Sequence, residues 1–130
     1  MTTMKELVQL FSSNQNENIN LWHYLGNFLD AFYYPALTSE ERFALVADEP
    51  DQYENITQRD YAFLAGTVHK ICFDYKVRPP EWVIKPKYFL DKPVFSLDAK
   101  GTLRIVLLVE SPYEFRMRNI FTSANTLDRV

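Results

Sequence analysis

The feature that most constrains the fold is a long helical pattern in the middle of the chain. Residues 58–76 carry apolar side chains three and four positions apart, which places them on one face of an α-helix. That face comprises Tyr61, Leu64, Ala65, Val68, Cys72 and Tyr75. The start is marked by Thr57 with Asp60 three residues later, a capping pattern, and Pro79 and Pro80 end the segment. A helix with one apolar face packs against other elements, so we expect this segment at the centre of a helical domain.

Several other segments show helical spacing or helix-start motifs. Residues 4–11 and 20–34 are amphipathic, and a capping box at Thr38 opens a short helix over 40–47. Gly26 lies inside the second of these helices and predicts the close approach of another element. Near the C-terminus, Ser111-Pro112 predicts a further helix start, with a short helix through about residue 118.

Residues 102–110 are ambiguous between helix and strand. Ile105, Val106 and Val109 are β-branched and suit a strand. The sequence offers no obvious second strand, however, and a sheet needs more than one, so we predict a helix. The preceding residues 98–101 form a turn pattern.

The connection between the long helix and this segment is rich in proline. Residues 78–96 contain four prolines among large aromatic and aliphatic side chains, which predicts irregular or single-turn structure wrapped on the core. The predicted fold is therefore all-α: one domain over residues 1–130, a compact array of about six helices with an irregular proline-rich connection at 78–96. A chain of 130 residues with 20 aromatic side chains has enough apolar material for such a core.

Composition excludes several classes of protein. A single cysteine forms no intrachain disulfide, and three glycines leave no room for a glycine-rich phosphate loop. No segment resembles a signal peptide or approaches the roughly 20 apolar residues of a membrane span. We therefore expect a soluble cytoplasmic domain with no cofactor, no metal and no membrane contact.

Charge is divided unevenly along the chain. Residues 1–60 hold three basic and ten acidic side chains, a balance of −7, whereas residues 61–130 hold eleven basic and seven acidic ones, a balance of +4. The simplest interpretation is that the two halves present complementary surfaces within one domain. Positive charge left unpaired on the outside would then be available to a partner.

Two small groups of residues resemble parts of catalytic or metal sites. His69 and Cys72 are three apart on the long helix, but a zinc site needs more ligands than they provide. His23, Asn27 and Asp30 form a polar stripe, which suits either a general base or, more simply, a solvated helix face. No catalytic residue is assigned, and an enzyme with an unrecognised site around His23 or His69 remains one alternative.

Basic and aromatic residues alternate over residues 70–92, a pattern that single-stranded nucleic acid grooves use. The residues concerned are Lys70, Phe73, Tyr75, Lys76, Arg78, Trp82, Lys85, Lys87, Tyr88, Phe89 and Lys92. The acidic overall composition and the need to anchor an irregular segment favour a structural role for the aromatic residues instead. A nucleic-acid-binding module is therefore a second alternative.

The C-terminal part of the chain resembles a known group of proteins. The resemblance lies in Trp82, YFLDKPVF at 88–95, ESP at 110–112, Phe115-Arg116, RNIF at 118–121, and Leu127 with Arg129. It is to a poorly characterised bacterial family whose region stands alone or follows a helix-turn-helix domain. Some members look like partners encoded beside candidate toxins. The resemblance implies a bacterial, cytoplasmic, regulatory or interaction-related protein and carries over no catalytic residue.

The leading hypothesis is a small protein-interaction or regulatory module of antitoxin-like type. We expect it to bind a protein partner through its basic, aromatic C-terminal half. The candidate interaction residues are Trp82, Lys85, Lys87, Phe115, Arg116, Arg118 and Phe121. The sequence predicts no oligomeric state.

Overall fold

The computed structural model describes residues 1–14, 20–95 and 101–129, and over these residues the protein is all-α with six α-helices. The helices are α1 (Met4–Ser13), α2 (Leu21–Phe32), α3 (Ser39–Val46), α4 (Gln58–Asp74), α5 (Thr102–Glu110) and α6 (Tyr113–Arg116). Two single 3₁₀ turns, η2 (Glu81–Ile84) and η3 (Pro86–Tyr88), and two short strands, β1 (Val94–Phe95) and β2 (Ile120–Phe121), complete the described structure. The predicted fold class is confirmed, and none of these helices is long and apolar enough to cross a membrane.

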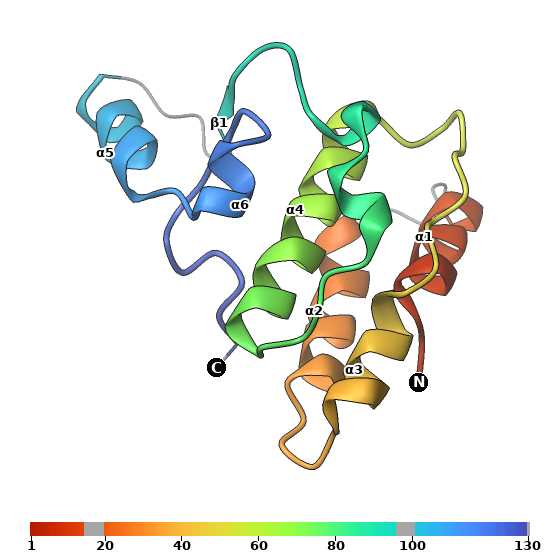
Figure 1. The fold of residues 1–130 in the computed structure, drawn as a ribbon. Coiled ribbons are helices and arrows are strands. Elements are labelled where there is room, and N and C mark those ends of the chain that lie inside the picture. Colours follow the sequence, from red (N-terminus) through yellow and green to blue (C-terminus); the bar gives the residue numbers. More distant parts are fainter. Residues whose placement is uncertain (15–19, 96–100, 130) are drawn as a thin grey trace.

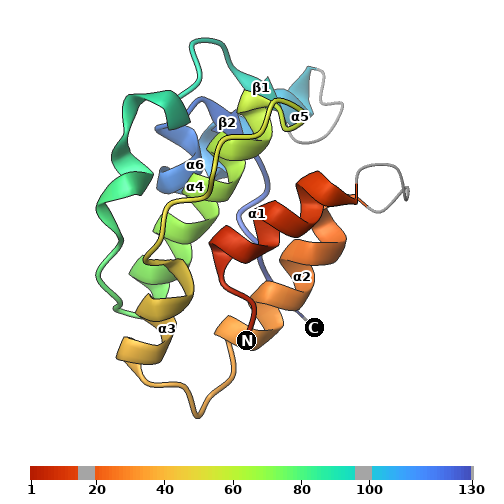
Figure 2. The same ribbon diagram turned by 90° about the vertical axis from the view of Figure 1, so that its right-hand side faces the viewer.

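The long helix α4 lies at the centre of the fold, as its apolar face predicts. Its N-cap is Thr57, whose hydroxyl accepts a hydrogen bond from the backbone N–H of Asp60 at 3.1 Å. The 3₁₀ turns and α6 pack against it, while α1 and α2 form an antiparallel pair on the other side (Figures 1 and 2). The central helix is therefore covered along its length.

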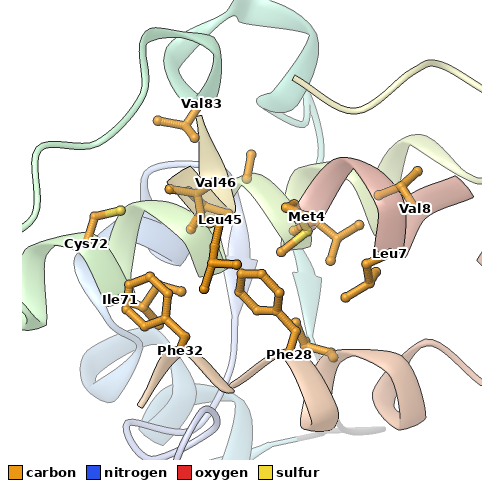
Figure 3. Close-up of a cluster of buried hydrophobic side chains, with 14 of the residues drawn as sticks. Met4, Leu7, Val8, Phe28, Phe32, Leu45, Val46, Ile71, Cys72 and Val83 are labelled. Carbon is orange, nitrogen blue, oxygen red and sulfur yellow. The ribbon is translucent and has the colours of Figure 1, made fainter. Parts of the chain in front are cut away.

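The main hydrophobic core joins the first four helices and η2. Figure 3 shows Met4, Leu7 and Val8 of α1 and the rings of Phe28 and Phe32 of α2 gathered with side chains of α3 and α4. Cys72 belongs to this core and is fully buried, and burial raises the pKa of its thiol to about 12. Cys72 is therefore a packed apolar residue rather than a nucleophile or a metal ligand.

Two glycines allow close contacts with the C-terminal part of the chain. At Gly66 on α4, an added Cβ would lie 2.8 Å from the ring of Phe115, so the glycine lets α6 approach α4 closely. At Gly26 on α2, an added Cβ would lie 3.0 Å from the guanidinium of Arg129. The neighbour at Gly26 is thus the end of one side chain, not the helix or strand that the sequence predicted to approach there.

The proline-rich connection is irregular, as predicted, and is anchored by aromatic side chains. Trp82 is buried and donates a hydrogen bond from Nε1 to the backbone oxygen of Val46 at the end of α3, at 2.9 Å. Tyr88 is also buried and lies against the rings of Trp82 and Tyr61. These side-chain contacts hold the connection on the core, because its irregular backbone forms few regular hydrogen bonds.

A parallel strand pair, which the sequence analysis did not predict, ties the connection to the C-terminal segment. Val94 pairs with Ile120 and Phe95 with Phe121. The side-chain amide of Asn119 donates to the backbone oxygen of Leu90 at 2.7 Å, and Asn119 itself has a left-handed backbone with φ of 65°. Each strand has only two residues, too few for an alternating pattern to be recognisable in the sequence. Of the predicted turn at 98–101, only residue 101 lies within the described residues.

Candidate interaction surface

Helix α5 lies at the edge of the molecule, away from α1 to α3 (Figure 1). It forms over the ambiguous segment 102–110, where the helix prediction is confirmed. Its N-cap is Gly101, whose φ of 61° is the left-handed conformation that glycine adopts without strain, and no side chain caps this end. The helix ends at Glu110, and its C-cap Ser111 starts the turn into α6.

A small apolar cluster, separate from the main core, holds α5 in place. Leu107 is the buried side chain of the helix, at 3% exposure, and it packs with Phe121 of β2 and Phe95 of β1. The two phenylalanine rings stack with centroids 5.2 Å apart, and the Arg104 guanidinium lies 4.3 Å from the centroid of the Phe95 ring. The strand pair thus forms the platform on which α5 sits.

A buried hydroxyl fixes the C-terminal end of α5 to the segment after β2. Ser111 Oγ accepts a hydrogen bond from the backbone N–H of Thr122 at 2.8 Å, and it also lies within hydrogen-bond reach of the backbone oxygens of Leu107 and Thr122. Ser111 and Thr122 are both buried. Because these groups satisfy one another, the helix end is held without a large apolar contact.

The opposite side of α5 is aliphatic and open to solvent. Ile105 is 62% exposed, Val106 37%, Leu108 41% and Val109 70%. These four residues, here termed the α5 face, lie around one side of the helix because successive residues are about 100° apart. Leu103, on the same side of the helix as Leu107, and Tyr113 of α6 are also exposed, and the α5 face itself carries no charged side chain. An uncharged aliphatic surface of this kind is typical of contact sites.

Four of the seven candidate interaction residues lie inside the protein. Trp82, Phe115, Arg118 and Phe121 are all buried, so in this conformation they offer no surface to a partner. The three aromatic rings anchor the connection, α6 and β2, and Arg118 binds backbone oxygens. The sequence pattern of aromatic and basic residues arises here because an irregular segment needs large anchors, the structural interpretation that the sequence also allowed.

The two candidate lysines are paired with an acid from the first half of the chain. Lys85 Nζ lies 2.6 Å and Lys87 Nζ 2.8 Å from the two carboxylate oxygens of Glu49, and the Tyr88 hydroxyl donates to the same group at 2.6 Å. Burial alone would raise the pKa of Glu49, but these three hydrogen bonds lower it to about 2. Arg116 is the remaining candidate, and it is exposed.

Within the part of the chain that the structure describes, three ion pairs join the acidic and basic halves. Besides the two at Glu49, Arg129 binds Asp30 with nitrogen-to-oxygen distances of 2.9 and 3.1 Å. These contacts pair part of the uneven charge within the fold, in the way the interpretation of complementary surfaces predicts. The ion pair with Arg129 also separates Asp30 from the other two residues of the predicted polar stripe. His23 and Asn27 instead line a hollow of about 310 Å³ against α1.

A larger groove of about 520 Å³ lies between the end of α3 and the proline-rich connection. Its lining includes Arg78, with its guanidinium 5.0 Å from the Phe43 ring centroid, and Lys85. Three acidic residues, Asp48, Glu49 and Glu81, line the same groove. This mixture of charges does not suit the polyanionic backbone of a nucleic acid, and the buried rings of Trp82 and Tyr88 are not available for stacking on bases.

The buried Arg118 side chain forms a hydrogen-bond network that includes His69. Its guanidinium donates to the backbone oxygens of Glu114 at 2.7 Å and Val83 at 2.6 Å, lies 3.2 Å from His69 Nδ1, and stacks on the Phe89 ring. Burial lowers the pKa of Arg118 to about 10, and burial followed by the nearby guanidinium lowers the pKa of His69. His69 is therefore part of a structural contact with Arg118, and the described residues contain no cluster of three potential metal ligands.

Comparisons with protein-family models, with curated proteins and with solved structures found no match to this chain. The function is therefore inferred from the residues and their geometry. The surface that the sequence analysis missed is the α5 face. A helix that is apolar on all sides is usually buried, so nothing in residues 102–110 indicates that one side is left open.

Proposed function

We propose that the protein is a protein-interaction module and that the α5 face is its docking surface. The supporting observation is the exposure of four aliphatic side chains on a helix whose one buried side chain, Leu107, lies on the opposite side. Leaving such side chains in water forgoes the free energy that their burial would contribute. The partner that suits this surface is a protein offering an uncharged aliphatic surface of its own, such as a second amphipathic helix.

The finer part of the proposal concerns the biological setting. On the resemblance of the C-terminal region to a bacterial family, we extend the proposal to a cytoplasmic regulatory protein of antitoxin-like type. The exposed Arg116 and Tyr113 on α6 follow α5 in the chain, and arginine and tyrosine are enriched at the energetic centres of interfaces. These two residues add specificity to a contact centred on α5.

The nucleic-acid alternative has less support. Of the bases between residues 70 and 92, Lys70, Lys85 and Lys87 are already in ion pairs, with Asp74 or Glu49. Gel shifts on single- and double-stranded DNA and RNA at low and moderate salt test this alternative. Binding that weakens steeply with salt would favour it over the docking proposal.

The docking proposal is tested with a matched pair of variants. Ile105→Glu/Val109→Glu places two charges at the centre of the α5 face. Ile84→Glu places one such charge on an isoleucine of η2 with nearly equal exposure, 61% against 62% for Ile105. Partners captured from host cells with tagged protein, including differently tagged copies of the chain itself, are purified and their binding measured by calorimetry.

We expect the double variant to bind at least about tenfold more weakly and the Ile84→Glu control to bind like wild type. Equal binding by the double variant would overturn the proposal, as would equal losses in both variants.

A further inference from the structure

We infer that α5 opens as a separate unit: the helix detaches from the strand pair and unwinds while the other helices stay folded. Opening uncovers an apolar surface formed by Phe95 and Phe121, which Leu107 covers in the closed conformation. The inference does not depend on the docking proposal, because it concerns how α5 is attached and not what binds to it.

Few side chains hold α5, which lies at the edge of the molecule (Figure 1). Over residues 102–110, Leu107 is the one buried side chain, and it packs with Phe95 and Phe121 in a cluster apart from the main core. The guanidinium of Arg104 adds a contact with the face of the Phe95 ring. By contrast, α4 buries nine residues. Because packing supplies most of the stability of a helix in a protein, α5 detaches at a much smaller cost in free energy than α4.

The helix has little stability of its own. It has nine residues, and isolated helices shorter than about 12–15 residues are only marginally stable in water. Four of the nine are β-branched, which lowers helix propensity: Thr102, Ile105, Val106 and Val109. No side chain caps the N-terminus, and the helix has no acidic residue in its first turn and no basic residue in its last turn to balance its dipole. Once it leaves the strand pair, α5 therefore unwinds.

The strand pair has its own attachment to the rest of the fold. Ile120 is buried in the main core, whereas its neighbour Phe121 belongs to the cluster under α5, since successive side chains of a strand point to opposite faces. The backbone N–H of Val94 donates to the oxygen of Asn119 at 2.8 Å, and the side-chain amide of Asn119 donates to the backbone oxygen of Leu90 at 2.7 Å. These contacts do not involve α5, so the strand pair stays in place when the helix leaves.

The chain after α5 supplies the point about which the helix opens. Ser111 is buried, and its hydroxyl accepts a hydrogen bond from the backbone N–H of Thr122 at 2.8 Å. Pro112 has no N–H, so the hydrogen bonds of α5 end at Ser111 and those of α6 start again from the oxygen of Pro112. α6 is fixed separately, because Phe115 is fully buried and lies against Gly66 of α4. α5 therefore opens about Ser111 without loosening α6.

Native-state hydrogen exchange on the wild-type chain tests the inference without any substitution. It is measured at several urea concentrations below the unfolding transition, because the dependence on urea reports how much surface each opening exposes. We expect the amides of residues 105–110 to share one level of protection, at least about tenfold lower than that of α4 and less dependent on urea. Protection and urea dependence equal to those of α4 would overturn the inference, as would α5 amides that exchange independently of one another.

A matched pair of phenylalanine variants tests what holds the helix. Phe95→Ala removes a ring from under α5, whereas Phe73→Ala removes a ring of α4 that is 73% exposed. We expect Phe95→Ala to lower the protection of α5 by about tenfold more and to leave that of α4 within about twofold. Phe73→Ala is expected to change neither. Equal losses in α4 and α5, or an α5 protection that Phe95→Ala leaves unchanged, would overturn the inference.

Thiol labelling of a Leu107→Cys variant gives a second readout with an internal reference. The native Cys72 is fully buried in the main core, so its labelling reports the opening of the core, while the new thiol at position 107 reports the opening of α5. Under native conditions we expect the thiol at position 107 to react at least about tenfold faster than Cys72. Reaction of both thiols at the same rate would contradict a separate opening of α5.

Discussion

Helices α4 and α5 are both rich in apolar residues, yet they have opposite surroundings. α4 is packed by α6 and both 3₁₀ turns, and seven of its residues from Leu64 to Cys72 are buried. α5 has a higher proportion of apolar residues but buries only Leu107. The difference shows that burial depends on what the rest of the chain supplies: α4 lies between two packed layers, whereas α5 meets only a strand pair of two residues each. An apolar helix that no other element covers leaves its apolar side chains exposed.

The largest effect is expected in the packed region, at Trp82. Trp82→Ala removes a buried ring and its hydrogen bond to Val46, and we expect a loss of about 3–5 kcal/mol in the free energy of unfolding. Urea denaturation followed by circular dichroism measures it, and Ile84→Ala on the same turn serves as the exposed control. A loss below about 1 kcal/mol would show that the connection is not anchored on the core.

A smaller and more local effect is expected at Leu107. Leu107→Ala empties the cluster with Phe95 and Phe121, and we expect a cost of about 2 kcal/mol that falls mainly on α5. Hydrogen exchange should accelerate over 102–110 while the amides of α4 keep their protection. An equal acceleration of hydrogen exchange in α4 and α5 would show that α5 unfolds together with the rest of the protein.

The contact between His69 and Arg118 predicts a pH dependence. The pKa of His69 is lowered in the folded state, so the unfolded state binds the proton more readily. Stability is therefore fully present above about pH 6.5, the unfolded value, and falls as the pH drops towards the folded value. The charged groups near the ring are Arg118 and Glu114. Glu49 loses its contribution in a separate window, between about pH 4.5 and about 2.

The variant that checks this prediction is His69→Gln, which keeps an acceptor for Arg118 but does not titrate. Unfolding free energies measured between pH 7.5 and 5 should fall less steeply in this variant than in wild type. An unchanged slope, or a His69 pKa at or above about 6.5 by NMR, would contradict the predicted environment.

The smallest effect is expected on the α5 face. Ile105→Glu/Val109→Glu exchanges exposed side chains that contact little within one chain, so the unfolding free energy of the monomer should change by less than about 0.5 kcal/mol. Denaturation at low protein concentration measures it. A loss as large as that of Leu107→Ala would mean that the face is covered within the monomer.

The sequence was sufficient for most of the fold and for little of the surface. The caps at Thr38 and Thr57, the breaks at proline and the spacing on α4 are local, and they predicted the helices because local hydrogen bonds and apolar periodicity determine where helices begin and end. The pairing of β1 with β2 joins residues far apart in the chain through two residues each, so no local pattern reveals it. The candidate residues Trp82 and Phe115 were identified as important, but the same ring types serve a core and an interface, and only the fold separates the two roles.

The most direct test of the central claim is hydrogen exchange over residues 102–110 with and without a captured partner protein. If the α5 face is a docking surface, the partner should increase the protection of α5 in wild type and in Ile84→Glu, and leave it unchanged in Ile105→Glu/Val109→Glu. Protection of α5 that the partner leaves unchanged in wild type would contradict docking through this face.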